Sequence, residues 1–329
     1  MKVYILAPLH ENGIKWLRSH EGVEVVTYDM PEVNNWHENA DAIIVRGNKV
    51  TAADMDNAPN LKCISKHGIG MDVIDIEHAR ERGIFVCNTP TESVEAVAEH
   101  AIALLMAVSR RVVINDRRVH EDKVREGAVG GKLPMDSPLI GCELYGKTLG
   151  LLGFGRIAIR VGEICRKGFG MNIRAYAPDI KINRWAGADF AAERYEDLAK
   201  MVEGCDYISC HLPINDKNRD MINAEILRHC KPNCIIVNTG RGGVVNELDL
   251  YEALKNGQIQ GAASDVYEQE PPDPANPLFT LPNFVATPHM GVNTIEALVR
   301  QSESSCKNVY NALTGHPEEI PGLIVNPLK

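Results

Sequence analysis

The sequence predicts an α/β protein with mainly parallel, doubly wound sheets, and three observations favour that class. Short apolar runs rich in β-branched residues alternate with helical patterns along most of the chain, which is typical of βαβ units. The length of 329 residues corresponds to about two domains at roughly 150 residues each. Hydrophobic residues make up 44% and charged residues 24% of the chain, so a large core can be buried without disulfides or metals.

The first 90 residues are expected to form one αβ series. Five apolar runs predict strands, and each is followed by a polar or helical stretch: VYILA, VEVVTY, DAIIVR, LKCIS and GIFVC. One long amphipathic helix is then expected from Thr91 to about Arg125, because apolar residues recur there at helical spacing. The stretch that follows, REGAVGGKLPMDSPLIG, is rich in Gly and Pro and is expected to be a surface loop.

A second αβ series begins near Gly146. Six further apolar runs predict strands: TLGLLG, MNIRAYA, DYISCHL, NCIIVNT, IQGAASDV and NFVATPH. The last helix is expected from about Thr294 to Thr314, and a short tail, PGLIVNPLK, follows it. The sequence therefore predicts two αβ units joined by long helices.

Composition narrows the partners and the compartment. The 35 Lys and Arg residues against 44 Asp and Glu residues give a net charge of −9, which argues against nucleic acid as the main partner. The longest apolar run, Ala101 to Val108, is far shorter than the ~20 residues of a membrane helix, and MKVYILAPLH is too short for a signal peptide. Nine scattered cysteines without a C-x-x-C pair favour neither a metal site nor disulfides. We expect a cytoplasmic protein.

The first chemical signal is a glycine turn. Gly153 and Gly155, with Ala158 in the place of a third glycine, follow an apolar strand and open a helix. In that context Gly153 permits the tight turn, Gly155 lets the backbone approach a pyrophosphate, and the helix N-terminus offers N–H donors to the phosphates. Arg156 could add a charged contact. A dinucleotide-binding turn is therefore favoured over an ordinary glycine turn.

The residue at the end of the next predicted strand, MNIRAYA, indicates whether a protein of this type binds NAD or NADP. An acidic residue that binds the adenine ribose is commonest there, but the position holds Ala177, with Asp179 two residues later. Without an acid at 177 nothing there need repel a 2′-phosphate, which Lys181 or Arg184 could approach, whereas Asp179 argues for NAD. The sequence leaves both cofactors open.

Three later segments place polar residues just after apolar strands, where open α/β sheets bind their ligands. They supply Arg241, Glu270 and His289. Reducing a carbonyl by hydride transfer needs a cation that fixes a substrate carboxylate, a proton donor and a group that sets the donor's charge state. Arg241 suits the first role, His289 the second and Glu270 the third. Each residue alone has an ordinary structural explanation, but all three together favour catalysis.

The sequence resembles the D-isomer-specific 2-hydroxyacid dehydrogenases over nearly its whole length. The motifs that carry the resemblance are KHGIGMDVIDIEHARERGIFVCNTP, ESVEAVAEHAIALLMAVSRR, GKTLGLLGFGRIA, CHLPIN, IIVNTGRGGVVNE, ASDVYEQEPP and ATPHMG. The resemblance implies that Arg241, Glu270 and His289 are catalytic, and that the backbone around Gly68, Ile69 and Gly70 receives the substrate carboxylate. It further implies NAD or NADP contacts from a larger set: Gly153, Gly155, Arg156, Ile157, Ala177, Pro178, Asp179, His211, Pro213, Thr239 and Asp265.

The resemblance also implies a discontinuous layout with two Rossmann-like domains. Residues 1–98 and 291–329 would form the substrate-binding domain, and residues 99–290 would form an inserted NAD(P)-binding Rossmann domain. Members of the family are usually homodimers that pack through the nucleotide domain. The stretch before the glycine turn lacks the tryptophan that many members carry, which indicates a different subgroup.

The expected activity is hydride transfer between NAD(P)H and a small 2-keto acid or D-2-hydroxy acid. Candidates for substrate specificity flank the loops of the implied cleft: Arg46, Asn48, Lys66, His67 and Met290. Glyoxylate, hydroxypyruvate, phosphohydroxypyruvate and longer 2-keto acids all stay open. A 2-imino acid needs the same hydride path and proton donor, and a non-catalytic NAD(H)-binding sensor of the same fold is the alternative from another class.

Overall fold

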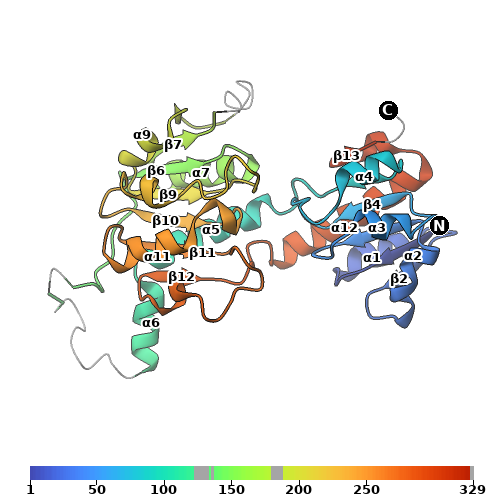
Figure 1. The fold of residues 1–329 in the computed structure, drawn as a ribbon, viewed down its shortest axis with the longest axis horizontal. Helices are drawn as coiled ribbons and strands as arrows, with labels where there is room; N and C mark the ends of the chain where they lie inside the picture. Colours follow the sequence, from blue (N-terminus) through green and yellow to red (C-terminus); the bar gives the residue numbers. More distant parts are fainter. Residues whose placement is uncertain (122–132, 135–136, 179–187, 327–329) are drawn as a thin grey trace. The chain divides into compact units, whose positions relative to one another are not determined.

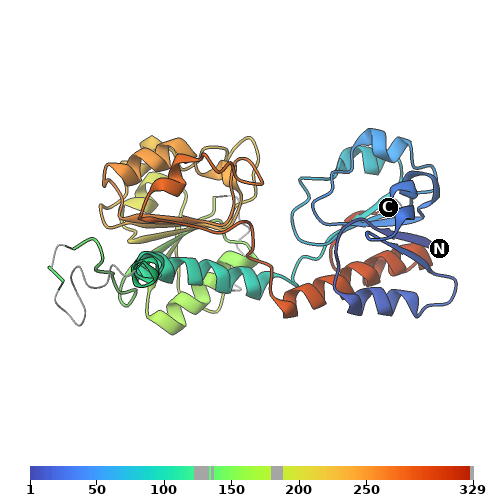
Figure 2. The same cartoon turned by 90° about the horizontal axis from the view of Figure 1, so that it is seen from below.

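The computed structural model describes residues 1–121, 133–134, 137–178 and 188–326. The chain divides into two compact units, which are described separately: unit 1 comprises Met1–Ala96 and Val292–Lys329, and unit 2 comprises Val97–Gly291. Each unit is a mainly parallel sheet with helices on both faces (Figures 1 and 2), which confirms the predicted α/β class. Within the described ranges, no helix is long and apolar enough to cross a membrane.

Unit 1 contains a six-stranded sheet with the order β13-β5-β4-β3-β1-β2. Its strands are β1 (Lys2–Ile5), β2 (Glu24–Thr27), β3 (Ala42–Val45), β4 (Cys63–Lys66), β5 (Phe85–Cys87) and β13 (Leu323–Val325). All pairs are parallel except β13 with β5, which is antiparallel. Its helices are α1 (Glu11–Arg18), η1 (Pro31–Asn35), α2 (Trp36–Asn39), α3 (Ala52–Asp56), α4 (Ile76–Glu81), α12 (Ile295–Thr314) and η5 (Pro317–Glu319).

Side-chain alternation along the strands gives this sheet two apolar faces. On β1, Val3 and Ile5 pack in one core cluster with Leu17 of α1 and Val309 of α12, while Tyr4 packs in the opposite cluster with α2, α3 and α4. Both faces are therefore buried, as expected for a parallel sheet.

Unit 2 contains a seven-stranded parallel sheet with the order β12-β11-β10-β9-β6-β7-β8. Its strands are β6 (Thr148–Leu152), β7 (Asn172–Tyr176), β8 (Glu193–Tyr195), β9 (Tyr207–Cys210), β10 (Ile235–Asn238), β11 (Gly261–Ser264) and β12 (Phe284–Ala286). The described helices are α5 (Val94–Ser109), which begins in unit 1, α6 (Val112–His120), α7 (Arg156–Phe169), α9 (Leu198–Glu203), α10 (Ala224–Leu227), η3 (Gly242–Val244), α11 (Glu247–Lys255) and η4 (Pro277–Thr280). The strand order reverses between β6 and β9, and parallel sheets bind ligands at such a switch point.

The single long helix predicted from Thr91 to about Arg125 is wrong. Helix α5 ends at Ser109, Arg111 adopts the left-handed region with φ 54°, and α6 begins at Val112. The Ser109 carbonyl accepts a hydrogen bond of 2.8 Å from the Cys142 N–H. This long-range contact replaces the next helical bond, so helical periodicity alone does not reveal the break.

Two short strands were not predicted. β8 (Glu193–Tyr195) is polar and only three residues long, so it lacks an apolar run. β13 (Leu323–Val325) lies in the apolar part of the C-terminal tail, which was expected only to follow the last helix. The predicted helix from Thr294 to Thr314 agrees with α12, whose N-cap is Thr294.

Candidate active site

The glycine turn between β6 and α7 has the local features that a pyrophosphate requires. Gly153 has φ 89°, and a Cβ there would lie 2.9 Å from the Leu212 Cδ2. Gly155, the N-cap of α7, has ordinary extended backbone angles, and a Cβ there would meet nothing within 4 Å. Ala158 is fully buried in the first turn of the helix, and no side chain caps the helix N-terminus. Gly155 therefore leaves open space next to uncapped N–H donors, which fits a dinucleotide.

The segment after β7 is partly described. Ala177 is buried, and its N–H donates to the Tyr195 carbonyl on β8 at 3.4 Å. The Pro178 carbonyl accepts a 2.9 Å hydrogen bond from the Arg194 guanidinium. Asp179, together with Lys181 and Arg184, lies outside the described residues.

Three further cofactor candidates follow β9 and β10. The His211 ring contacts the Ser209 Oγ at 2.8 Å through Nε2 and the Thr239 Oγ1 at 3.3 Å through Nδ1. Burial lowers the pKa of His211 to about 4, so the ring is neutral at pH 7. Pro213 is exposed, and its carbonyl accepts a hydrogen bond from the Asn218 side chain.

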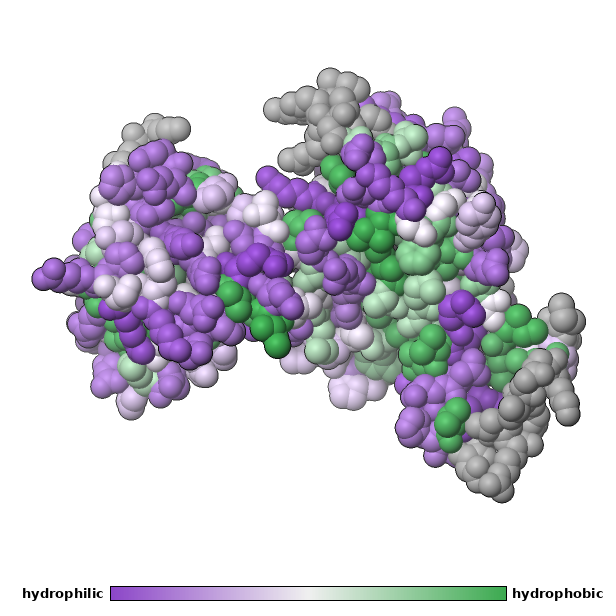
Figure 3. All heavy atoms as spheres, turned by 180° about the vertical axis from the view of Figure 1, so that it is seen from behind, coloured by the Kyte–Doolittle hydropathy of each residue, from purple (hydrophilic) through white to green (hydrophobic). Residues whose placement is uncertain are grey.

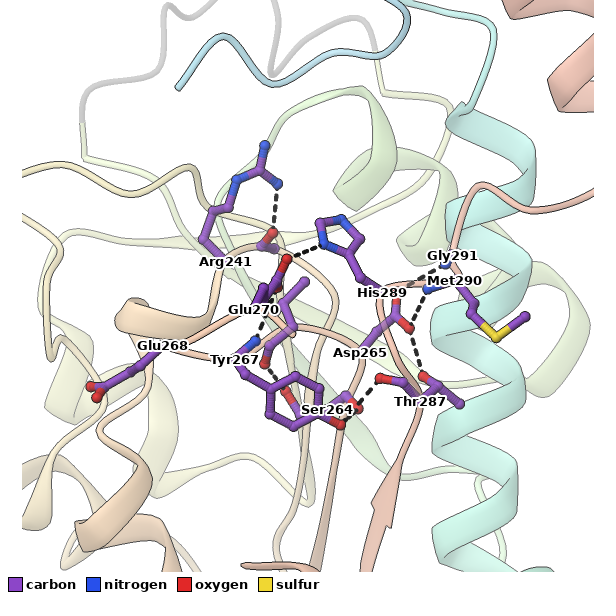
Figure 4. A network of polar contacts seen from close by, with 12 residues as sticks. Arg241, Ser264, Asp265, Tyr267, Glu268, Glu270, Thr287, His289, Met290 and Gly291 are labelled. Atoms are coloured by element: carbon purple, nitrogen blue, oxygen red, sulfur yellow. Dashed lines mark hydrogen bonds and ion pairs between the residues drawn. The ribbon is translucent and has the colours of Figure 1, made fainter. Parts of the chain in front are cut away.

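Arg241, Glu270 and His289 come together at the carboxyl ends of β10, β11 and β12 (Figure 4). The His289 Nδ1 lies 2.6 Å from the Glu270 Oε2, and the other Glu270 oxygen accepts from the Tyr267 N–H at 3.2 Å. The Arg241 Nη1 donates to the Gly240 carbonyl at 2.8 Å.

The charge state of Glu270 follows from its surroundings. Burial raises the pKa of Glu270, but the hydrogen bond and charge of His289, the Tyr267 N–H and the charge of Arg241 outweigh burial and hold the pKa below 4.5. The carboxylate is therefore ionised at neutral pH and can orient a histidine that holds or gives up a proton.

The backbone at His289 is strained. His289 has φ 54°, a left-handed conformation that costs a non-glycine residue about 1–2 kcal/mol. Its N–H donates to the Asp265 carbonyl at 2.8 Å, and the Met290 and Gly291 N–H groups donate to the two Asp265 carboxylate oxygens at 2.8 Å each. The Asp265 carboxylate is thus used to fix the loop that carries His289.

Two polar groups that sequence reasoning missed complete this network. The Thr287 Oγ1 donates to the Asp265 Oδ1 at 2.6 Å, and the His100 Nε2 on α5 lies 3.0 Å from the Thr287 Oγ1 and 3.3 Å from the Asp265 Oδ1. A histidine among the apolar residues of AEHAIALL was a possible signal. Its partner Thr287, however, lies 187 positions away in the sequence, so the fold was needed to connect them.

The substrate candidates Arg46, Lys66 and His67 lie in unit 1, at the carboxyl ends of the adjacent strands β3 and β4. The Arg46 Nη2 donates to the Asn293 Oδ1 at 2.7 Å, and the Lys66 Nζ donates to the His67 carbonyl at 3.0 Å. His67 is buried, and burial together with the charges of Arg46 and Lys66 lowers its pKa to about 4. At neutral pH His67 is therefore uncharged, and Arg46 and Lys66 are the two cations that favour an anion at this place.

The turn from Gly68 to Gly70 follows these residues. Gly68 has φ 127°, and its N–H donates to the Thr89 Oγ1 at 2.9 Å. The Ile69 carbonyl accepts from the Asn88 Nδ2 at 2.9 Å. Of the remaining specificity candidates, Asn48 donates its amide to the Leu6 carbonyl, and Met290 exposes its side chain next to His289 (Figure 4).

Comparison with known proteins shows to which family this chain belongs. The sequence model of the D-isomer specific 2-hydroxyacid dehydrogenase, NAD binding domain, matches residues 102–291. The chain belongs to the D-isomer specific 2-hydroxyacid dehydrogenase family. The resemblance noted in the sequence is thereby confirmed.

Relatives within this family cover almost the whole chain. The D-3-phosphoglycerate dehydrogenase of Methanocaldococcus jannaschii is 38% identical over 97% of this chain and 59% of that protein. The glyoxylate reductase of Thermococcus litoralis is 38% identical over 99% of this chain and 96% of that protein. The chain thus spans about three fifths of the length of the phosphoglycerate dehydrogenase it matches.

Solved structures of similar sequence share the fold. The TT0316 protein from Thermus thermophilus is 33% identical with a TM-score of 0.86, over 99% of this chain and 100% of that one. D-lactate dehydrogenase from Aquifex aeolicus, complexed with NAD and lactic acid, is 26% identical with a TM-score of 0.82, over 99% of both chains. An acyclic imino acid reductase in complex with NADPH and D-Arg is also 26% identical with a TM-score of 0.82, over 99% of this chain and 100% of that one.

Proposed function

We propose that the protein is an NAD(P)H-dependent oxidoreductase that interconverts a small 2-keto acid and the corresponding D-2-hydroxy acid. The observation that carries the proposal is the 2.6 Å pair of His289 and Glu270 beside Arg241, at the same sheet edge as the glycine turn. When bound, the nicotinamide supplies the hydride that adds to C2 of the keto acid. The protein must then bind the carboxylate and supply one proton to the C2 oxygen.

Each of the three side chains has one role in this proposal. Arg241 binds the substrate carboxylate and polarises the adjacent carbonyl. His289 donates the proton to the C2 oxygen during reduction and accepts it during oxidation. Glu270, ionised because its pKa is lowered, accepts from the His289 Nδ1 and so directs Nε2 toward the substrate.

The proposed cofactor site comprises the glycine turn and the strand ends of unit 2. Gly153, Gly155, Arg156 and Ile157 would hold the pyrophosphate, and the side chain at the adenine ribose is the uncharged Ala177. The proposal includes both NADH and NADPH, because Ala177 neither binds a ribose hydroxyl nor repels a 2′-phosphate. Related solved structures carry NAD in one case and NADPH in another.

The two units have different roles in this proposal, one in binding the substrate and the other in binding the cofactor. Residues 1–98 and 291–329 are proposed to bind substrate and residues 99–290 to bind the cofactor, with the amides of Ile69 and Gly70 as carboxylate donors because Gly68 already donates to Thr89. We also propose a homodimer that packs through unit 2. Its support is α6, on which no residue is buried and Val112 and Val119 are exposed; Figure 3 shows hydrophobic atoms at the α6 end of this unit.

The cations of unit 1 favour a substrate with a second negative group. Arg46 and Lys66 lie at neighbouring strand ends, and an additional anion there would offset the repulsion between their two positive charges, which also keeps His67 neutral. This favours a phosphorylated keto acid, such as the oxidised substrate of a D-3-phosphoglycerate dehydrogenase, over glyoxylate. The Lys66→Met variant should then raise KM for the phosphorylated acid by about tenfold, the effect of one lost charged contact, and leave KM for glyoxylate nearly unchanged.

The decisive experiment is a substrate panel assayed with NADH and NADPH in parallel. It contains glyoxylate, hydroxypyruvate, phosphohydroxypyruvate and a 2-keto acid mixed with an amine, which tests imine reduction as found in the named imino acid reductase. Turnover of a keto acid supports the proposal, and turnover only with the amine present moves the assignment to imine reduction. Tight NADH binding without any turnover would instead favour a sensor.

A further inference from the structure

The His289 loop is fixed by more than the strand that precedes it. Three N–H groups of residues 289 to 291 donate to Asp265, but they all depend on where that one side chain and its backbone lie. Asp265 is only 2% exposed, so its carboxylate has almost no contact with bulk solvent. The position of His289 therefore depends on what orients a single buried carboxylate.

Two side chains outside residues 289 to 291 contact the Asp265 carboxylate, those of Thr287 and His100. The Thr287 hydroxyl has one proton, and the 2.6 Å contact with the Asp265 Oδ1 uses it, because an ionised carboxylate only accepts. The Thr287 oxygen can then only accept. The His100 Nε2, at 3.0 Å from this oxygen, must therefore carry the proton and donate to it, and the same N–H lies 3.3 Å from the Asp265 Oδ1.

The charge state of Asp265 depends on the same contacts. Burial raises the pKa of Asp265, but the hydrogen bonds from His100, Thr287 and the N–H groups of Met290 and Gly291 outweigh burial and lower the pKa below 3.8. An ionised carboxylate in a buried place needs every donor it has, because a missing donor leaves an acceptor without a partner. His100 is the donor supplied by an element other than the loop itself.

Helix α5 holds His100 in a fixed position beside the His289 loop. His100 lies on α5 next to the apolar residues that anchor the helix in the unit 2 core, among them Ala101 and Leu104. The loop also packs closely on this helix, since a Cβ on Gly291 would lie 3.7 Å from the His100 Cδ2. The imidazole is thus held by a rigid element and contacts the loop directly.

We propose that His100 is a positioning residue for His289, whose imidazole fixes the Asp265 carboxylate and the Thr287 hydroxyl so that the His289 loop keeps its left-handed conformation. The inference rests on the proposed role of His289 as proton donor. It assigns no contact with substrate or cofactor to His100.

The test compares His100→Leu, which removes the donor, with His100→Gln, whose amide can still donate. Glu99→Gln on the exposed side of α5 is the matched control. We expect His100→Leu to lower kcat by ~10- to 100-fold, because a small misplacement of a catalytic group has effects of that size. His100→Gln should restore most of the lost kcat, and the control should equal the wild type.

Two further measurements separate positioning from general structural damage. Amide hydrogen exchange at Met290 and Gly291 should be faster in His100→Leu than in the wild type, and it should return to normal in His100→Gln. In a His289→Ala background His100→Leu should cost no additional kcat, because the two residues act through one path. An additive loss, equal losses in both His100 variants, or unchanged exchange and kcat in His100→Leu would overturn the proposal.

The exchange measurement needs no substrate. If no keto acid or imine is turned over by the wild type, the proposed function fails while the exchange rates at Met290 and Gly291 still decide whether His100 fixes the loop. If the wild type is active and His100→Leu is indistinguishable from it, only the positioning role fails.

Discussion

At the scale of single residues, His289 is constrained from two sides. Its Nδ1 contacts an ionised Glu270, and its backbone occupies a left-handed conformation held by hydrogen bonds to Asp265. In the proposed mechanism the contact with Glu270 orients the proton-carrying ring, and the hydrogen bonds to Asp265 determine where the ring lies. A substitution at 289 therefore tests chemistry, whereas a substitution at 100 or 287 tests placement.

Replacing His289 by Ala should lower kcat by ~10²–10⁴-fold, because a general acid contributes about that much. Cofactor binding, followed by the fluorescence of bound NADH, should be unchanged, since no cofactor contact is assigned to this side chain. Leu248→Glu on the exposed face of α11 serves as the control. Wild-type turnover in His289→Ala would contradict the assignment.

His67 gives a pH dependence of stability with a definite sign. Its pKa of about 4 lies below the ordinary 6.5, so between these values the unfolded chain binds more protons than the folded one. Neutral His67 therefore contributes its full share to the free energy of unfolding above pH 6.5, and this contribution is lost as the pH falls toward 4. Acidification from pH 7 to pH 5 should lower the free energy of unfolding by about 2 kcal/mol through this residue.

Urea unfolding at several pH values measures this dependence. His67→Gln should have a shallower loss of stability on acidification than the wild type. His211, whose pKa is also about 4, lies in unit 2 and should keep its own contribution in that variant. Identical pH slopes for the wild type and His67→Gln would show that His67 is not the titrating group.

At the scale of elements, the two glycines of the β6–turn–α7 segment have different roles, one in folding and one in the proposed binding of the cofactor. Gly153 is required by the backbone, because its φ is 89° and a Cβ would approach Leu212. Gly155 has no such requirement, since its angles suit any residue and its surroundings are open. A glycine that folding does not need is most simply explained by a ligand that comes close.

The two glycines therefore make a matched pair. Gly155→Ala should leave the melting temperature unchanged and weaken NADH binding about tenfold or more, because a methyl group would occupy the proposed pyrophosphate position. Gly153→Ala should destabilise the fold by about 1–2 kcal/mol. Calorimetry and NADH titration of both variants check this prediction, and full NADH affinity in Gly155→Ala would count against a cofactor at the turn.

Most of the strands, but not the joins between elements, were predictable from the sequence. Eleven apolar runs were expected as strands and each overlaps one, because burial on both faces of a parallel sheet leaves a continuous apolar segment. The end of α5 was not predictable, because the Cys142 N–H that replaces the next helical bond comes from a distant loop. Polar β8 carries no apolar signal at all.

The candidate site, too, was predictable from the sequence only in part. Arg241, Glu270 and His289 were expected from polar residues at strand ends, and the structure brings them together. The contribution of His100 to the same loop was missed, because it comes from a helix far away in the sequence.

At the scale of the whole molecule, the proposed dimer can be tested on α6. The double variant Val112→Glu and Val119→Glu, at positions that are 53% and 63% exposed, should convert a dimer into a monomer, because two charges would replace the apolar contacts of the interface. Light scattering after gel filtration measures the mass. The variant Leu248→Glu, at a similarly exposed apolar position on α11, should remain dimeric.

The division of unit 1 into two chain segments has a consequence for biosynthesis. The apolar face of its sheet that carries Val3 and Ile5 is covered by α1 and by α12, which is translated only after all of unit 2. Unit 2 can thus complete its core while unit 1 still lacks a covering helix. A chain truncated before residue 295 should expose this face to chaperones, and a released chain that contains α12 should not.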